Sequence, residues 1–210
     1  MTDYLTEQEQ IELLKSWIKQ YTPVIVMGIL IAVIGISGWR YWQQREAKIL
    51  THASAVYDEM LTARSQNDAK ATFIQADKLF THYPRTTYSQ MAALMLARDA
   101  VIKKNYPEAE KHLQWILDKS SDTSFRQIAR IRLARILIAE QKPDAALKLL
   151  QTIDDKSFNG LTEEVQGDAY YALKNNAMAR QSYKQALADL PNAEIIRPLL
   201  QMKYDNLATT

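Results

Sequence analysis

No charged residue occurs between Gln20 and Trp39, and this uncharged run constrains the fold more than any other feature of the sequence. As a helix the run would be about 30 Å long, which matches the hydrocarbon core of a bilayer. Aromatic residues stand near both ends, where membrane helices carry their interfacial anchors: Tyr21, Trp39, Tyr41 and Trp42. The run therefore predicts a transmembrane anchor over residues 23–42.

A cleaved signal peptide and a buried core helix are the alternatives to an anchor. A signal peptide begins with a short basic region and ends in small residues at its cleavage site. Here the small pair Ser37-Gly38 is followed by the bulky residues Trp39 and Arg40, and a core helix rarely carries an aromatic belt at each end. The segment before the run is also acidic, with Asp3, Glu7, Glu9 and Glu12. An uncleaved anchor fits these features best.

Residues 1–22 predict a short amphipathic helix ahead of the anchor. Thr6 and Glu9 have the spacing of a capping box, in which Thr6 would be the N-cap. Apolar residues follow at helical spacing: Ile11, Leu14, Ile18 and Tyr21. Such a helix would lie on a membrane surface or dock on a partner protein, and its acidic start argues against simple adhesion to anionic lipid.

Three small residues within the run share one helix face, namely Gly28, Ala32 and Gly35. A stripe of this kind lets a second membrane helix approach closely, so it is the predicted transmembrane helix contact. The alternative is that glycine is simply common in membrane helices.

Charges on the two sides of the anchor give a weak topology signal. Lys15 and Lys19 precede it, whereas three basic residues follow it: Arg40, Arg45 and Lys48. The positive-inside rule thus favours a cytoplasmic location for the C-terminal part by one charge, although large domains translocate largely regardless of such counts.

Residues 43–207 predict a domain of helix hairpins. No stretch alternates with period two for long enough to be a good strand, and helix-forming residues dominate. Turn-forming residues interrupt the pattern at regular intervals: Asn67-Asp68, Tyr83-Pro84, Tyr106-Pro107, Lys119 to Ser124, Lys142-Pro143, Asn159-Gly160, Asn175-Asn176 and Leu190-Pro191.

The hairpins repeat in the manner of tetratricopeptide units, most clearly over residues 163–191. Small and aromatic residues alternate there where such a repeat needs them: Gly167, Tyr170, Ala179, Tyr183 and Ala186. Ala109, Ala146 and Ala179 are equivalent positions whose spacing varies around the period of about 34 residues. Residues 193–207, with Pro198 at the start or at a kink, predict a helix that caps the last repeat. The predicted fold is all-α, a single N-terminal transmembrane helix followed by an α-solenoid of tetratricopeptide-like hairpins.

Composition argues against chemistry in this chain. It contains no cysteine, only 5 glycines and a net charge of +2, which excludes thiolate metal sites and phosphate-binding glycine loops and gives no general attraction to nucleic acid. The histidines, His52, His82 and His112, form no metal-ligand pair. We therefore expect no catalytic residue, metal or cofactor.

The main basic cluster is on residues 126–135 and comprises Arg126, Arg130, Arg132 and Arg135. It is short and lacks interleaved aromatic residues, so it predicts a salt-bridged helix surface rather than a nucleic-acid site. The repeat register points a mixed set of apolar and charged residues toward the concave side, where solenoids bind extended polypeptides. These predicted partner-binding residues, some of which could instead be core, are Met91, Leu94, Arg98, Ile131, Arg135, Asp168 and Tyr171.

Over essentially its whole length the chain resembles the YfgM family. The resemblance rests on the acidic N-terminal helix, the uncleaved anchor, the repeats and a series of short motifs in order: Gly38-Trp39-Arg40-Tyr41-Trp42, Leu133-Ala134-Arg135, Asp144-Ala145-Ala146-Leu147-Lys148 and Gln201-Met202-Lys203 with Asn206-Leu207.

This resemblance implies a non-enzymatic ancillary subunit of the bacterial Sec translocon, SecYEG. It implies a cytoplasmic N-terminal segment, a single pass through the inner membrane lipid, and a periplasmic repeat domain that links translocated chains to the chaperone PpiD. That topology opposes the one-charge bias. The alternative function is a membrane-tethered repeat scaffold for another envelope process, such as division or outer-membrane assembly.

Overall fold

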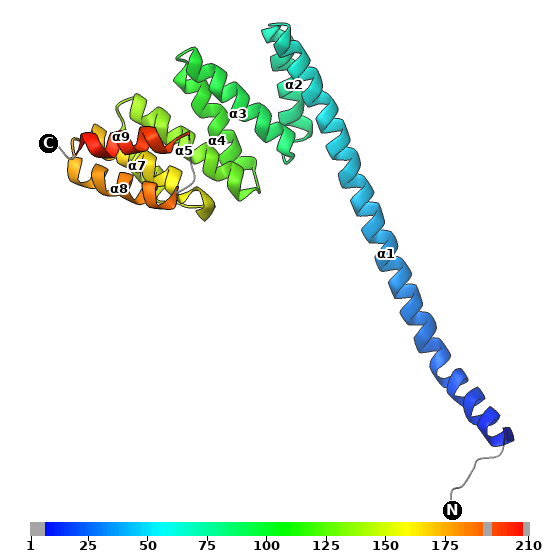
Figure 1. Cartoon of the computed structure of the whole chain (residues 1–210). Coiled ribbons are helices and arrows are strands. Elements are labelled where there is room, and N and C mark those ends of the chain that lie inside the picture. The colour runs from blue at the N-terminus through cyan, green and yellow to red at the C-terminus, as the bar shows by residue number, and fades with distance from the viewer. Residues whose placement is uncertain (1–6, 191–194, 208–210) are drawn as a thin grey trace, which may run out of the picture. The chain divides into compact units, whose positions relative to one another are not determined.

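The computed structural model describes residues 7–190 and 195–207 and forms two compact units, Met1–His52 (the anchor unit) and Ala53–Thr210 (the repeat unit). The described elements are all helical, which confirms the predicted class (Figure 1). They are α1 (Glu7–Ser65), α2 (Ala69–His82), α3 (Thr87–Ile102), α4 (Tyr106–Lys119), α5 (Thr123–Ala139), α6 (Pro143–Leu150), the 3-10 helix η1 (Lys156–Phe158), α7 (Asn159–Ala172), α8 (Asn176–Asp189) and α9 (Arg197–Asn206).

Helix α1 carries the uncharged run. Its part Trp17–Ser65 contains a stretch that is long and apolar enough to cross a membrane, and the described side chains of that stretch are exposed, for example Val24 at 67% and Ile34 at 70%. Such exposure of large aliphatic groups is costly in water and suits a lipid environment. The predicted N-cap Thr6 lies outside the described residues.

The helix passes through the predicted domain boundary at residue 43 without interruption. The repeat unit begins at Ala53 instead, where the first buried core side chain occurs. Residues 43–52 are mostly polar and exposed, so they have little apolar surface with which to join a core.

Four helix hairpins make up most of the repeat unit: the end of α1 with α2, α3 with α4, α5 with α6, and α7 with α8. The same turn joins the two helices of each hairpin. Its left-handed residue is never glycine, being Asn67, Lys104, Gln141 and Lys174 in turn. In each turn the next residue donates a backbone hydrogen bond to a carbonyl five residues earlier, as Asn105 does to Ala100, which closes a Schellman-type cap.

Small residues at equivalent positions let the helices pack closely. The predicted repeat alanines Ala109, Ala146 and Ala179 are all fully buried. Gly167 on α7 lies against the ring of Tyr183 on α8, which confirms the predicted crossing. The tetratricopeptide register is therefore present in the structure.

Helix α9 covers the last hairpin. Leu200 and Leu207 are buried against Ala179, Tyr183 and Ala186. Pro198 lies in the first turn of α9, where its missing N–H costs nothing, so it starts the helix rather than kinking it.

Candidate partner-binding groove

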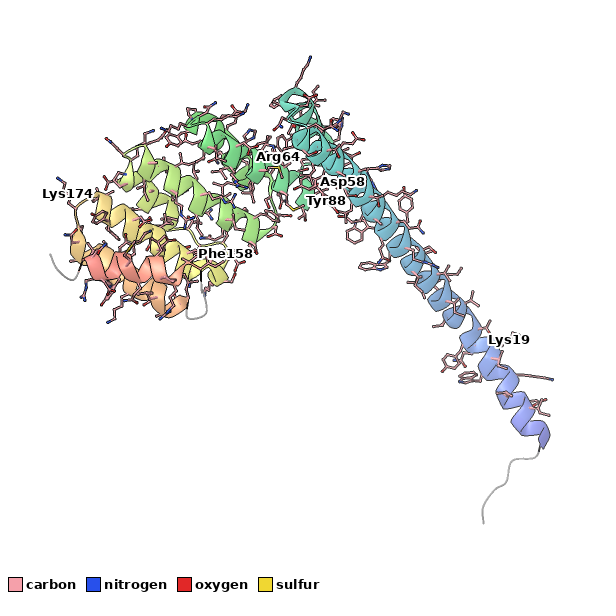
Figure 2. All side chains as sticks on the ribbon, turned by 45° about the horizontal axis from the view of Figure 1, so that its top comes forward. Lys19, Asp58, Arg64, Tyr88, Phe158 and Lys174 are labelled. Atoms are coloured by element: carbon pink, nitrogen blue, oxygen red, sulfur yellow. The ribbon has the colours of Figure 1, made fainter. Side chains whose placement is uncertain are left out.

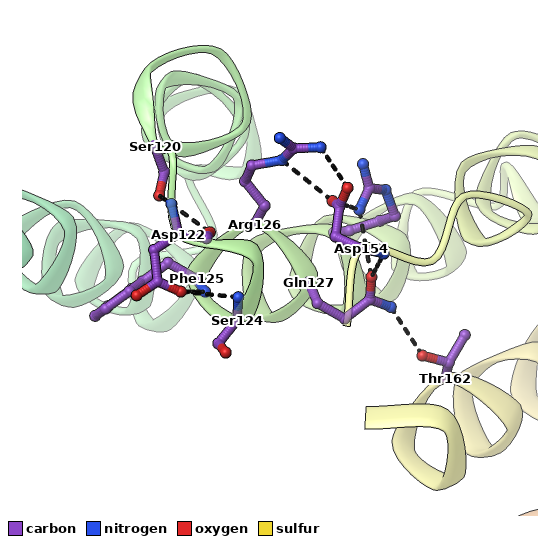
Figure 3. Close-up of polar contacts among 9 residues, drawn as sticks. Ser120, Asp122, Ser124, Phe125, Arg126, Gln127, Asp154 and Thr162 are labelled. Atoms are coloured by element: carbon purple, nitrogen blue, oxygen red, sulfur yellow. Dashed lines mark hydrogen bonds and ion pairs between the residues drawn. The ribbon is translucent and has the colours of Figure 1, made fainter. Parts of the chain in front are cut away.

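The predicted basic cluster divides into residues with different surroundings. Arg126 and Arg130 both form ion pairs with Asp154, whose side chain is only 7% exposed (Figure 3). Burial alone would raise the pKa of Asp154, but hydrogen bonds from Arg130 and Arg126 outweigh it and hold the pKa below its usual value. These two arginines therefore tie the segment after α6 to α5 and are not available to a partner.

Buried Gln127 extends the same contact. Its side-chain carbonyl accepts a hydrogen bond from the backbone N–H of Asp154 at 2.9 Å, and its amide donates to the hydroxyl of Thr162 at 3.0 Å (Figure 3). Gln127 thus connects α5, the loop and α7, and sequence reasoning missed it because a single glutamine gives no periodic signal.

Arg135 belongs to a chain of charges that runs from α5 through α7 to α9. Its guanidinium donates to Glu164 at 2.6 Å, and the ammonium of Lys203 donates to Glu164 at 2.9 Å and to Asp168 at 2.7 Å. Burial alone would raise the pKa of Glu164, but Lys203 and Arg135 together lower it. Both carboxylates of this charge chain, Glu164 and Asp168, therefore have a cationic partner.

Beside this charge chain a groove of about 350 Å³ opens between α3 and α5. Apart from arginines, its walls are formed by apolar and aromatic side chains (two of them from α4): Ala97, Val101, Ile102, Tyr106, Leu113, Ile136 and Ala139. Three arginines also line it, Arg98 from α3 and Arg132 and Arg135 from α5. We call this site the arginine groove.

Glu164 neutralises Arg135, but the other two arginines of the groove have no carboxylate partner among the described residues. Among the residues that the structure describes, Arg98 and Arg132 form no ion pair, and Arg132 donates a hydrogen bond of 3.5 Å to the carbonyl of Leu94. Desolvation, and then repulsion from Arg135 and Arg98, lower the pKa of Arg132. An anionic group placed between them would relieve that repulsion.

The predicted partner-binding residues do not all lie together. Arg98 and Arg135 meet at the arginine groove, Met91 and Leu94 are half-buried on α3, and Tyr171 on α7 is 59% exposed. Asp168 is held by Lys203 and by the hydroxyl of Tyr183, which donates to it at 2.7 Å.

Ile131 does not belong to the predicted partner-binding surface. It is 3% exposed and packs in the core against Ala134, Ala146 and Val165. Its side chain cannot meet a partner, because it is packed in this core although Arg135, one helical turn later on nearly the same side of α5, is exposed. Arg132, which sequence reasoning left out, lines the groove; its spacing of three residues from Arg135 was the available signal.

The predicted transmembrane contact, Gly28, Ala32 and Gly35, forms an open face on α1. No atom lies within 4 Å of a Cβ built on Gly28 or Gly35, and Ala32 is exposed. Side chains project from more than one side of α1 near Lys19 (Figure 2).

Two larger cavities lie beside the second helices of hairpins. One, of about 740 Å³, is bordered by Glu110, Lys111 and Lys148, and the other, of about 500 Å³, by Arg64, Asp99 and His112. The charges in the second cavity are matched, because Arg64 pairs with Asp99. Within the described part of the chain no cluster of histidine and carboxylate side chains could hold a metal ion.

Comparison with known proteins gives matches over almost the full chain. Residues 15–209 match the family described as a tetratricopeptide repeat-like domain. Three similar proteins carry the name ancillary SecYEG translocon subunit. That of Neisseria gonorrhoeae is 32% identical over 99% of this chain and 100% of its own. That of Haemophilus influenzae is 29% identical over 97% and 98%. That of Escherichia coli K12 is 29% identical over 99% and 100%. No solved structure matches the chain.

Proposed function

The chain belongs to the YfgM family of ancillary SecYEG translocon subunits, with their tetratricopeptide repeat-like domain, and from this premise we propose that it is itself a non-enzymatic subunit of the Sec translocon. The observation that carries the proposal is the match of anchor and repeats together, from one end of its relatives to the other. A fold shared only over the repeats would support no particular partner, since such repeats serve many functions.

We propose that α1 anchors the chain in the bacterial inner membrane in a single pass. Residues 1–22 would be cytoplasmic, residues 23–42 would span the membrane, and the repeat unit would lie in the periplasm. The apolar, exposed stretch of α1 supports the span. The one-charge bias points the other way and carries less weight, because domains of this size translocate largely regardless of flanking charge.

The repeat unit would act by binding rather than by catalysis. The face formed by α3, α5 and α7 offers the arginine groove and exposed Tyr171, which suit an extended polypeptide. Its partners would be chains leaving the translocon and the periplasmic chaperone PpiD. The subunit would thereby bring emerging chains and chaperone together at the membrane.

The stripe of Gly28, Ala32 and Gly35 would contact a membrane helix of SecYEG. Open space beside both glycines leaves room for a second backbone to approach. Ser37 lies on the opposite face of the helix, so it provides a matched control position.

Copurification in mild detergent tests the translocon assignment. Tagged full-length chain is expected to retain SecYEG, and Gly28→Leu with Gly35→Leu is expected to reduce the yield at least about tenfold by blocking close approach. Ser37→Leu, which adds the same bulk on the other face, should leave the yield unchanged. Absence of SecYEG from the wild-type eluate, or its replacement by division or outer-membrane assembly proteins, would refute the assignment.

Protease digestion of spheroplasts tests the topology independently. The repeat unit should be digested in intact spheroplasts if it is periplasmic. Protection until lysis would place it in the cytoplasm and remove the basis for a periplasmic chaperone partner.

A further inference from the structure

We propose that the arginine groove binds an extended peptide segment in which one large apolar side chain lies between two carboxylates. The proposal rests on the proposed function to the extent that it takes a polypeptide as the partner. It goes further by stating which chemistry the groove selects and which residues select it.

The walls of the groove favour an apolar side chain of the peptide. Val101 and Ile102, at the end of α3, remain 39% and 68% exposed, although valine and isoleucine are among the residues most often buried in folded proteins. Across the groove, small Ala139 leaves space rather than filling it. A volume of about 350 Å³ admits a large side chain but no folded domain.

Two arginines of the groove lack a carboxylate partner among the described residues, which favours an acidic ligand. Arg135 already has Glu164 as its partner, whereas Arg98 and Arg132 have no carboxylate among the described residues. These two guanidinium groups come from the two helices that flank the apolar recess. Two carboxylates, one on each side of the apolar side chain, would neutralise both.

Arginine is suited to this task. Its planar guanidinium binds a carboxylate through two parallel hydrogen bonds, and such bonds are strong where water is partly excluded. The pKa of Arg132 is already lowered by desolvation and by its two neighbours, so a bound carboxylate would remove an existing repulsion as well as add a contact. A nucleic acid would need stacking platforms, and Tyr106 is the single aromatic residue on the described walls.

Peptide binding to the full-length chain in nanodiscs of zwitterionic lipid tests the proposal. The probe is a short labelled peptide of glycine and serine that carries one leucine between two glutamates. We expect replacement of both glutamates by glutamine to weaken binding at least about tenfold, because two charge-assisted pairs are lost. Replacement of leucine by serine should weaken it by a similar factor.

Paired variants assign the effect to the groove. Arg98→Gln with Arg132→Gln should abolish the preference for glutamate over glutamine, while the exposed position of both arginines should leave the unfolding midpoint unchanged. Lys111→Gln with Lys148→Gln removes the same charge from the 740 Å³ cavity and should leave the preference intact. A wild-type chain that binds both peptides equally, or a control pair that loses as much preference, would overturn the proposal. Equal binding of an oligonucleotide would also overturn it, because it would reveal unspecific attraction to anions.

Translocon copurification with the same variants separates the two proposals. If the Arg98 and Arg132 variant loses the peptide but keeps SecYEG, the groove proposal holds and the translocon uses another surface. If wild-type chain copurifies with SecYEG but shows no preference among the peptides, the groove proposal fails and the translocon assignment stands.

Discussion

The ring of Tyr183 lies directly over Gly167, so that a Cβ on residue 167 would come within 2.4 Å of the ring carbon Cε1. Tyr183 cannot move aside easily, because it is 3% exposed and its hydroxyl is bonded to Asp168. This contact fixes how closely α7 and α8 cross.

Gly167→Ala should therefore destabilise the repeat unit. Forcing a methyl group into a packed core costs about 1–3 kcal/mol, of which the better helix propensity of alanine returns up to about 1 kcal/mol. Thermal unfolding of the full-length chain followed by circular dichroism measures the net loss. Gly38→Ala adds a methyl group where no atom lies within 4 Å and should leave the transition in place. An unchanged midpoint for Gly167→Ala would mean that the ring can yield.

Asp154→Asn should cost about 3 kcal/mol, because Arg130, with a side chain 9% exposed, would keep its charge without a carboxylate partner. The folded-state pKa of Asp154 is below its unfolded value of about 3.9, so its contribution is present above that pH and is lost as the pH falls through the folded value. Urea unfolding at neutral pH should show the loss, and the difference between variant and wild type should shrink below about pH 4. A difference that persists at low pH would attribute the effect to packing instead.

His112 should make the repeat unit sensitive to mild acid. Burial lowers its pKa, which Glu108 at 3.2 Å only partly opposes. The stability contributed by the neutral ring is present above the unfolded pKa of about 6.5 and is lost as the pH falls toward the folded value. Unfolding midpoints measured between about pH 7 and pH 5 should fall in the wild type and fall less in His112→Gln. His82→Gln, on an exposed side chain, should keep the wild-type slope; a slope that His112→Gln retains would assign the acid sensitivity to other groups.

Lys142→Asn should stabilise the third hairpin. The second helices of the other hairpins begin with a side-chain cap from Asp68, Asn105 or Asn175, whereas Lys142 supplies none to α6. A new cap is worth about 0.5–1 kcal/mol, and the exposed Lys142–Glu140 pair that would be lost is worth less. Chemical unfolding measures the gain, and Lys148→Asn, inside the same helix, should have the opposite sign. A loss from Lys142→Asn would show that the turn holds the side chain away from the helix.

The hairpins, their turns and the capping helix could be predicted from the sequence because they depend on local patterns. Turn residues such as Asn67-Asp68 interrupt an otherwise continuous helical period, and the spacing of Ala109, Ala146 and Ala179 repeats the unit. The uncharged run of α1 is likewise a property of neighbouring residues.

The groove could be predicted only in part because it depends on which arginines find partners. Arg126, Arg130, Arg132 and Arg135 look alike along the chain, yet Asp154 and Glu164, 24 to 29 residues away, neutralise three of them. Ile131, predicted to face a partner, lies in the core. The sequence could not show this, because a small change of helix rotation decides whether a position faces the solvent or the next hairpin.

Helix α9 follows every other described helix along the chain, and Lys203 supplies the cation that Glu164 and Asp168 share. During synthesis, which runs from the N-terminus, those carboxylates exist before their lysine does. The last hairpin therefore reaches its full set of contacts only after α9 has been made, so that formation of the charge chain reports that the capping helix is in place.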